Sequence, residues 1–332
     1  MRVAVLGAGT MGSTYVRNLA KMKDVQPAGV CDIRSEAAGQ AAELWGTNAY
    51  ESLEAMVERE QPDVVCVCLP TYMHKEYVLK LAAMGKHVIC EKPIALNRED
   101  AEAMIRACRE AGVQLYIGHV LRFFPNYKDL HAKAKSGIVG TVQVAHAKRL
   151  SAFPKGWNRW FADASLSGGV ILDLMIHDLD FLRWTMGDVQ SVYAKLHKDE
   201  NMEYANVTLQ FRSGALANVE AFWGYPGAFT TGVELAGTRG VLRFDSSSSP
   251  TLEVRRIRRE EGGREGSGVP VPRTPAKHDP YYYELRHFLS CIAGESEPVI
   301  TAEDGYAALD IALAAAQSAS TGLPVRMGGV LA

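Results

Sequence analysis

Three ionisable residues interrupt an apolar stretch near the middle of the chain. Asp173, His177 and Asp180 follow the pair Gly168-Gly169, and apolar residues fill most of the positions between them. Their spacing of i, i+4 and i+7 predicts that all three project from one face of a buried helix. A histidine near carboxylates is suited to proton transfer, because its pKa lies close to neutral pH. The alternative is a core histidine whose neighbouring aspartates cap or pair locally, and this stretch alone does not decide between them.

A glycine-rich turn near the N-terminus predicts a dinucleotide site. An apolar run over residues 2–6 leads directly into Gly-Ala-Gly-Thr-Met-Gly, and a helical pattern follows over 13–22. This arrangement lets the backbone turn tightly, lets a pyrophosphate approach the bare chain at the helix N-terminus, and lets the helix pack closely on the strand. The residues expected to contact the cofactor in this turn are Gly7, Gly9, Thr10, Met11 and Gly12.

The choice between NAD and NADP depends on the end of the second strand. Asp32 follows this strand about twenty residues after Gly12, where an acid that binds the ribose hydroxyls is expected. A solvated carboxylate at the strand end is the alternative. Arg34 could accept a 2'-phosphate, whereas Asp32 would repel a phosphate and hydrogen-bond a free hydroxyl. The sequence favours NAD and leaves NADP open.

Helix and strand patterns alternate up to residue 118 and predict a doubly wound parallel sheet of the Rossmann type. The helices are expected near 36–45, 52–60, 74–84 and 98–111, and the strands over 63–68, 87–90 and 114–117. Ligands of such sheets bind beyond the carboxyl ends of the strands. Pro70 and His74, then Glu91 and Lys92, and finally Gly118-His119 collect at this edge.

Two of these strand-end residues have competing interpretations. Lys92 sits between an apolar strand and Pro93, where it is suited to stabilise charge on a substrate oxygen, and its alternative role is pairing with Glu91. His74 either caps its helix or contacts the cofactor. We include Pro70, His74, Glu91 and Lys92 among the expected cofactor contacts.

The sequence changes character after residue 118, where apolar residues begin to recur with a period of two. These runs cover 141–150, 189–197, 204–211, 215–223, 231–235, 241–244 and 252–256. They predict a large open, mostly antiparallel sheet with the helix 169–186 on one face and closing helices near 281–293 and 302–321. We therefore expect a dinucleotide-binding domain over 1–118 and an α+β substrate-binding and oligomerisation domain over 119–332.

The other face of this sheet mixes polar and apolar side chains. Thr208, Gln210, Asn218 and Glu220 alternate along it with Leu216 and Phe222. Such a mixture suits an interface between subunits as well as water, so we expect a homo-oligomer, either a dimer or a tetramer.

Composition narrows the class of protein and its partners. The chain has 332 residues, 47% hydrophobic and 22% charged, with a formal net charge of −2, which is typical of a globular protein that binds a small molecule rather than nucleic acid or an anionic membrane. No apolar run approaches membrane-spanning length, and the first is too short for a signal peptide. The six cysteines lack the spacing of a disulfide framework or zinc site, so we expect a cytoplasmic protein without a metal.

Several aromatic residues have no assigned role. Trp157 and Trp160 precede Gly168 in a loop and either wall a sugar or nicotinamide ring or belong to the core. The run Tyr281-Tyr282-Tyr283 poses the same question. The charged stretch 255–268 is interpreted as a solvated hairpin tip.

Taken together, these motifs resemble those of the Gfo/Idh/MocA oxidoreductase family, which includes glucose-fructose oxidoreductase and inositol 2-dehydrogenase. The likeness runs nearly end to end and rests on the glycine turn 7–12, Glu91-Lys92-Pro93, the stretch 122–125 (Arg-Phe-Phe-Pro), and the Gly-Gly pair leading to Asp173, His177 and Asp180. It implies a nicotinamide cofactor in the first domain, a substrate on the sheet domain, and catalytic Lys92, Asp173 and His177 at the cleft. It also implies a cis peptide before Pro93.

The expected reaction is the reversible oxidation of a secondary alcohol on a cyclitol or sugar. His177 takes the hydroxyl proton while a hydride leaves the same carbon for nicotinamide, and Lys92 stabilises the oxygen. Asp173, one helical turn earlier, is expected to orient the imidazole and favour its protonated form. Substrate contacts are expected from Lys92, Trp157, Asp173, His177 and Asp180. A sensing regulator without turnover and an NAD-assisted glycosidase are the rival functions, because fold alone does not decide among them.

Overall fold

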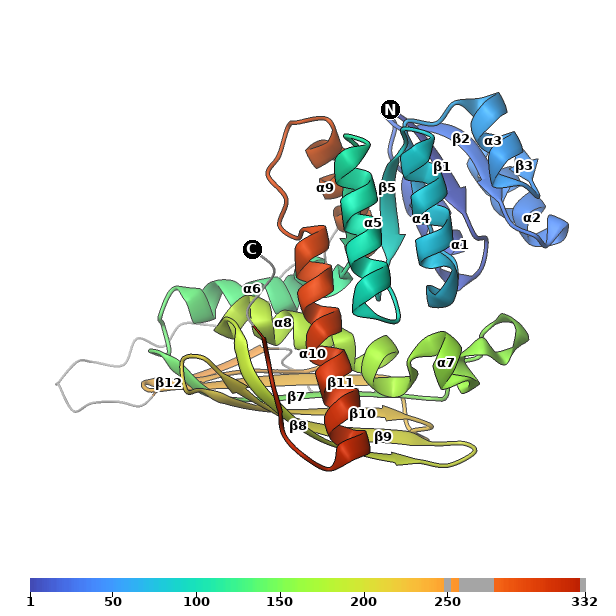
Figure 1. Cartoon of the computed structure of the whole chain (residues 1–332). Coiled ribbons are helices and arrows are strands. Elements are labelled where there is room, and N and C mark those ends of the chain that lie inside the picture. Colours follow the sequence, from blue (N-terminus) through green and yellow to red (C-terminus); the bar gives the residue numbers. More distant parts are fainter. Residues whose placement is uncertain (248–251, 257–277, 329–332) are drawn as a thin grey trace.

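The structure is a computed structural model in which residues 1–247, 252–256 and 278–328 are described (Figure 1). They form a parallel sheet flanked by helices, followed by a second, larger sheet with helices between the two (Figure 1). The expected hairpin tip over 255–268 lies, apart from its first two residues, outside the described residues.

The first sheet is parallel and has the strand order β3-β2-β1-β4-β5-β6. Its strands are β1 (Arg2–Leu6), β2 (Gln26–Cys31), β3 (Ala49–Tyr50), β4 (Val64–Val67), β5 (His87–Glu91) and β6 (Leu115–Gly118), and its helices are α1 (Thr10–Leu19), α2 (Ser35–Trp45), α3 (Leu53–Glu60), α4 (His74–Ala83) and α5 (Arg98–Glu110). Every residue of β4 is buried, as expected for a strand covered on both faces. The predicted doubly wound sheet is confirmed. The strand order reverses beside β1 and β4, the position where such sheets bind ligands.

The second sheet has the order β13-β12-β11-β7-β10-β9-β8-β14 among the described residues, and each neighbouring pair is antiparallel except β7 with β10. Its strands are β7 (Val142–Ser151), β8 (Val189–Lys198), β9 (Glu203–Phe211), β10 (Leu216–Trp223), β11 (Thr230–Gly237), β12 (Gly240–Asp245), β13 (Leu252–Arg256) and β14 (Val325–Arg326). The expectation of a large, mostly antiparallel sheet is therefore confirmed.

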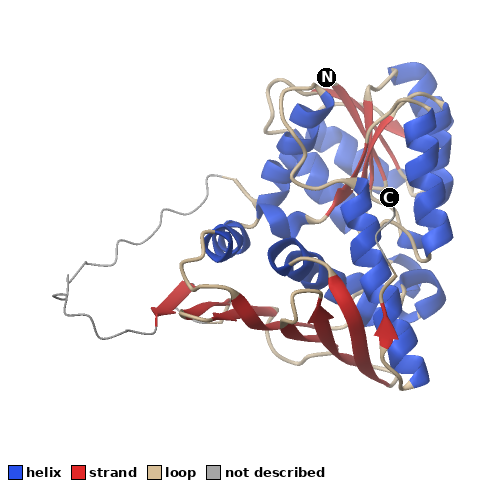
Figure 2. Ribbon diagram, turned by 60° about the vertical axis from the view of Figure 1, so that its left-hand side comes forward, coloured by secondary structure: helices blue, strands red, loops and turns tan. Residues whose placement is uncertain are grey.

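Three helices cover the face of this sheet that looks toward the first domain (Figure 2). They are α6 (Pro125–Lys135), α8 (Ile176–Met186) and α10 (Ala302–Thr321), of which α6 was not anticipated from the sequence. None of the helices in the described residues covers the opposite face, and Leu216 is 44% exposed on it. A hollow on this face is lined by polar residues that include His146, Asn218 and Glu220. Assembly through this face remains a prediction.

The helix α9 (Pro280–Ile292) departs from the predicted domain division. Leu285 and Phe288 on α9 share one apolar core with β1 and α1, and the Phe288 ring stacks on Tyr116 of β6 at 5.0 Å between ring centroids. The sequence assigned everything after residue 118 to the second domain, but α9 packs on the first, because its apolar face covers a side of that sheet.

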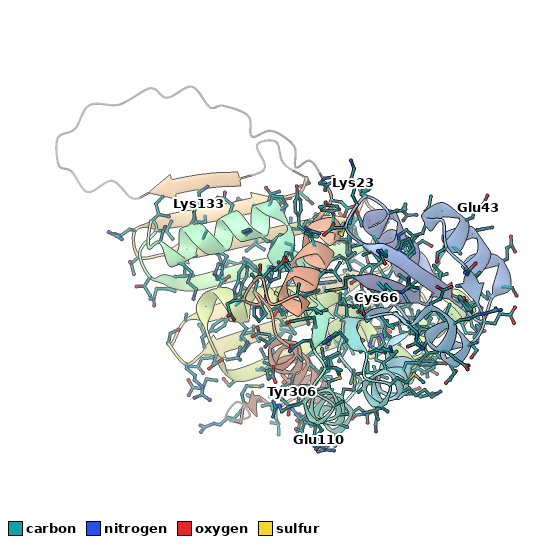
Figure 3. All side chains as sticks on the ribbon, turned by 90° about the horizontal axis from the view of Figure 1, so that it is seen from above. Lys23, Glu43, Cys66, Glu110, Lys133 and Tyr306 are labelled. Carbon is teal, nitrogen blue, oxygen red and sulfur yellow. The ribbon has the colours of Figure 1, made fainter. Side chains whose placement is uncertain are left out.

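The six cysteines are free thiols. In Figure 3, Cys66 lies inside the first domain, whereas Lys23, Glu43 and Glu110 lie at its periphery. Burial raises the pKa of the Cys66 thiol, so this side chain is an apolar filler rather than a nucleophile. No helix of the described residues has both the length and the hydropathy required to cross a membrane.

Candidate active site

The segment that carries Asp173 and His177 is not a regular helix. The short helix α7 (Ala164–Ser167) ends at Gly168 and Gly169, which have φ angles of +75° and +68°. A π-helical turn, η4 (Ile171–Met175), then precedes α8. A π turn shifts the residues after it relative to those before it. The regular i, i+4, i+7 face predicted from the sequence is therefore not formed.

Lys92 joins the two domains through Asp173. Its Nζ donates to the backbone oxygen of Asp173 at 2.8 Å and to the carboxylate Oδ1 at 3.0 Å, and both side chains are 14% exposed. The predicted meeting of these two residues is thus present in the structure. The alternative in which Lys92 pairs with Glu91 is not observed, because the ammonium turns toward Asp173. The peptide bond between Lys92 and Pro93 is cis, as the family resemblance implied.

His177 is held in its neutral form. Burial, followed by the positive charges of Lys92 and Arg149 and by His119, lowers the pKa of its imidazole well below 6.5. Its Nδ1 is buried and has no hydrogen-bond partner among the described residues. The expectation that Asp173 orients this ring and favours its protonated form is wrong, because Lys92 takes the Asp173 carboxylate.

Two further residues beside Lys92 complete this region. His119 follows β6, is fully buried, and has no partner for either ring nitrogen within the described chain. Burial lowers its pKa to about 4. Glu91 is 5% exposed, and its Oε2 accepts a hydrogen bond of 3.3 Å from the Lys92 backbone N–H. Burial raises the pKa of this carboxyl to about 7. The sequence placed His119 at this edge without a role, and only its position at a strand end signalled it.

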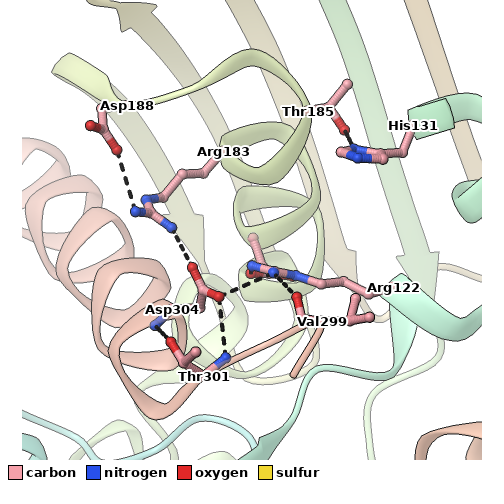
Figure 4. Close-up of polar contacts among 9 residues, drawn as sticks. Arg122, His131, Arg183, Thr185, Asp188, Val299, Thr301 and Asp304 are labelled. Carbon is pink, nitrogen blue, oxygen red and sulfur yellow. Dashed lines mark hydrogen bonds and ion pairs between the residues drawn. The ribbon is translucent and has the colours of Figure 1, made fainter. Parts of the chain in front are cut away.

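Asp180 does not face the Lys92 site. Arg122 donates to both of its carboxylate oxygens, at 3.0 and 2.6 Å, and the two side chains are 1–2% exposed. The expectation that Asp180 contacts substrate is therefore wrong, because its carboxylate is buried together with the guanidinium that binds both of its oxygens. Figure 4 shows Arg122 and Arg183 converging on Asp304 at the start of α10. This network supports α8 rather than presenting ligand-binding groups.

The glycine turn fits a bound pyrophosphate. A Cβ at Gly7 would lie 2.6 Å from the backbone oxygen of Cys68, and one at Gly12 would lie 1.7 Å from that of Gly7. A Cβ at Gly9 would meet nothing within 4 Å. Gly7 and Gly12 are therefore required by packing, whereas the space in front of Gly9 is open for a ligand to approach the backbone. Thr10 and Met11 begin α1 beside this space and remain predicted contacts.

Asp32 and Arg34 form one unit at the end of β2. The carboxylate of Asp32 accepts hydrogen bonds from the Ala8 N–H at 2.7 Å and from the Arg34 guanidinium at 2.9 and 3.0 Å. Burial raises the pKa of this carboxyl, but the bonds from Arg34 and Ala8 outweigh it and leave the pKa below 3.8. Asp32 is thus ionised beside the glycine turn, where it suits a ribose, while Arg34 partly neutralises it.

His74 supports the site without facing it. The helix-cap role expected for His74 is not observed, and its ring nitrogens lie 2.9 Å from the backbone oxygens of Leu69 and Pro93. The ring is fully buried. Its expected role as a cofactor contact is therefore wrong, because protein carbonyls occupy both nitrogens, although it ties the Pro70 segment to Pro93. Pro70 itself stays a predicted contact.

A loop from the second domain approaches the first near Tyr72. The segment η3 (Trp157–Ala162) has positive φ angles at Asn158 and Arg159, and Trp157 is 49% exposed. The Trp160 ring lies edge-on to Tyr72 at 6.5 Å between centroids. Trp160 therefore contacts the first domain, and Trp157 remains a predicted substrate contact.

The three tyrosines near residue 282 separate into two groups. Tyr281 packs against Tyr15 of the first domain, at 6.3 Å between ring centroids. Tyr282 stacks on His278 at 3.9 Å and meets Tyr283 edge-on. Tyr281 and Tyr282 both pack against the apolar core of the first domain, and within the described part of the chain no ring contact joins Tyr282 or Tyr283 to the Lys92 site.

The glycine turn of the Rossmann domain is open to a pyrophosphate. The Lys92–Asp173 pair joins this domain to a sheet domain that contributes a neutral histidine. These features together define an NAD-dependent oxidoreductase. Among the described residues, no group of three or more His, Cys, Asp or Glu side chains is arranged to hold a metal ion.

Comparisons with known proteins agree with this class. Residues 1–119 match the model of the oxidoreductase family with an NAD-binding Rossmann fold (GFO_IDH_MocA), and residues 127–243 match the GFO/IDH/MocA C-terminal domain. The chain therefore belongs to the Gfo/Idh/MocA oxidoreductase family, which confirms the resemblance drawn from its motifs.

Similar proteins include dehydrogenases and a hydratase. A myo-inositol 2-dehydrogenase from Thermotoga maritima is 30% identical over 345 residues, which cover 100% of each chain. A 2,7-anhydro-N-acetylneuraminate hydratase from Escherichia coli is 32% identical over 262 residues, covering 73% of this chain and 66% of that protein. The crystal structure of a probable dehydrogenase from Thermotoga maritima superposes with a TM-score of 0.80 and 27% identity over 98% of each chain.

Proposed function

We propose that this oxidoreductase oxidises a secondary alcohol of a cyclitol or sugar, with Lys92, Asp173 and His177 as its catalytic residues. The contact of the Lys92 ammonium with the backbone oxygen and Oδ1 of Asp173 carries the proposal, because it fixes a cation at the junction of the two domains. The myo-inositol 2-dehydrogenase relative supports a cyclitol as substrate.

The protonation state of His177 and the contacts of Lys92 indicate the role of each catalytic residue. His177 is neutral, so it is able to take the proton of the substrate hydroxyl. Lys92 stabilises the negative charge that grows on the same oxygen, and Asp173 holds Lys92 in place rather than orienting the histidine. NAD, held by the glycine turn and Asp32, supplies the hydride acceptor when bound. The free cysteines support the expected cytoplasmic location.

A screen of inositols and aldoses with NAD, followed by the absorbance of reduced nicotinamide, tests this function. On a substrate found in this way, Lys92→Ala and His177→Ala should each lower kcat by ~10²–10⁴-fold, the usual contribution of acid–base catalysis. Lys75→Ala, which breaks an exposed ion pair with Asp100 in the same domain, is the matched control. Near-normal turnover in either active-site variant would contradict the assignment.

A second candidate is cofactor-assisted cleavage or hydration of a sugar, in which NAD is reduced and reoxidised within one cycle. The hydratase relative favours it, as does the neutral His177, which is able to remove a proton next to a carbonyl group. Product formation without net release of NADH would support this candidate over the dehydrogenase.

A further inference from the structure

The segment that carries Asp173 and His177 is held at its beginning by a side chain of the underlying sheet. Glu203 Oε2, at the start of β9, accepts a hydrogen bond of 2.9 Å from the backbone N–H of Val170. Val170 is 1% exposed and Glu203 is 2% exposed, so water replaces neither partner. The first N–H groups of a helix have no partner inside it, and a carboxylate at this end is favoured by the helix dipole.

Gly169, the residue before Val170, leaves room for the Glu203 carboxylate. A Cβ on Gly169 would lie 2.8 Å from Glu203 Oε2, and the φ angle of +68° is itself unfavourable for other residues. The Gly169 N–H donates to Ser167 Oγ at 3.1 Å. The second glycine of the Gly-Gly pair is thus explained by the close approach of Glu203.

A cation on the neighbouring strand balances Glu203. Lys198 is the cross-strand partner of Glu203 on β8, and its Nζ lies 2.5 Å from Oε1. The Lys198 side chain is 42% exposed. The two carboxylate oxygens therefore have separate partners, a half-exposed ammonium for Oε1 and the buried start of the π-helical segment for Oε2.

We propose that Glu203 is a positioning residue for the reaction. By fixing the Val170 N–H, it fixes the start of the π turn η4, and so the place of the Asp173 oxygens that hold Lys92. The inference rests on the proposed function, since it assigns Glu203 a part in presenting the Lys92–Asp173 pair. Glu203 itself touches no reacting group.

Two conservative variants test whether the length or the charge of the Glu203 side chain matters. Glu203→Asp keeps the charge but is one methylene too short to reach Val170, whereas Glu203→Gln keeps an oxygen acceptor at the same reach. Because small misplacements of catalytic groups are costly, Glu203→Asp should lower kcat by ~10–100-fold with KM changed by less than ~3-fold, and Glu203→Gln should recover kcat to within ~3-fold. Lys198→Ala, which removes only the ion pair, is the matched control. Gly169→Ala disturbs the same contact from the other side if Glu203→Asp does not fold.

Amide hydrogen exchange gives a readout that does not depend on turnover. In the full-length protein with NAD, peptides spanning 168–176 should exchange ~10-fold faster in Glu203→Asp than in Glu203→Gln or Lys198→Ala, with peptides of the first domain unchanged. Equal exchange in all three variants would overturn the anchoring role, and faster exchange with unaltered kcat would overturn the positioning role. If the wild type oxidises no polyol, the proposed function fails, while the exchange comparison still decides whether Glu203 holds this segment.

Discussion

Replacing Glu91 with glutamine should remove a loss of stability that the protein undergoes as pH rises. Glu91 lies beside a second buried carboxyl, Glu284 on α9, and both have raised pKa values, chiefly because of burial. Tyr15 Oη donates to Glu284 at 3.4 Å, and each glutamate has one oxygen without a partner among the described residues. Two carboxylates in such a site are stable only while they hold protons.

The size and sign of the effect follow from the pKa of Glu91. Burial raises this pKa from 4.5 to about 7, so the folded protein binds the proton more tightly than the unfolded chain does. The stabilisation is complete below pH 4.5 and is lost as pH rises through 7. A shift of this size corresponds to roughly 3 kcal/mol of unfolding free energy. Glutamine does not ionise, so Glu91→Gln should gain stability relative to wild type by up to this amount between pH 5 and pH 8.

Urea unfolding at several pH values, followed by tryptophan fluorescence, measures this difference. Glu284→Gln should flatten the same pH dependence, because it removes the other carboxyl of the pair. Glu58→Gln, the same chemical change at an exposed site of α3, is the control and should follow wild type at each pH. A difference between wild type and Glu91→Gln that stays constant from pH 5 to pH 8 would refute the reasoning.

Three further outcomes are expected. NAD should bind more tightly than NADP in fluorescence titrations, because Asp32 is ionised beside the glycine turn; a clear preference for NADP would show that Arg34 controls the site. Light scattering at micromolar concentration should give an oligomeric mass that Leu216→Glu reduces, since Leu216 is 44% exposed on the uncovered sheet face; a monomeric wild type would contradict assembly through it. Oxidation of the alcohol should keep its rate below pH 6.5, because the lowered pKa of His177 leaves the imidazole neutral there; a fall in kcat of about threefold between pH 7 and pH 6, which an unshifted histidine would give, would count against His177 as the base.

Local sequence was sufficient for the parts of the site that are built locally. The glycine turn occupies a strand–turn–helix unit in which packing requires Gly7 and Gly12, while the space in front of Gly9 is open. Lys92 follows a strand with an apolar centre, and Asp173 stands in an apolar run, so pairing of the two opposite charges was the favourable way to bury both. These positions could be predicted because the physical constraint lies within a few residues.

Other features depend on partners far away in the chain. Asp180 faces away from Lys92 because Arg122, 58 residues earlier, binds its carboxylate. The segment leading to Asp173 begins where Glu203, 33 residues after Val170, captures a backbone N–H. The spacing of apolar residues does not reveal contacts between distant parts of the chain. It therefore predicted one regular helix face for Asp173, His177 and Asp180, where the chain forms a π turn. The apolar face of α9 was visible in the sequence, but which domain it would cover was not.

The return of α9 to the first domain affects how the protein is made. Leu285 and Phe288 complete an apolar core whose other members, including Val3 and Tyr116, are synthesised far earlier. A fragment ending at residue 118 would therefore expose the surface that α9 covers and should aggregate. During synthesis, one side of the N-terminal domain's core therefore stays uncovered until α9 has emerged from the ribosome. This order favours slow completion of the first domain and a need for protection by chaperones during synthesis.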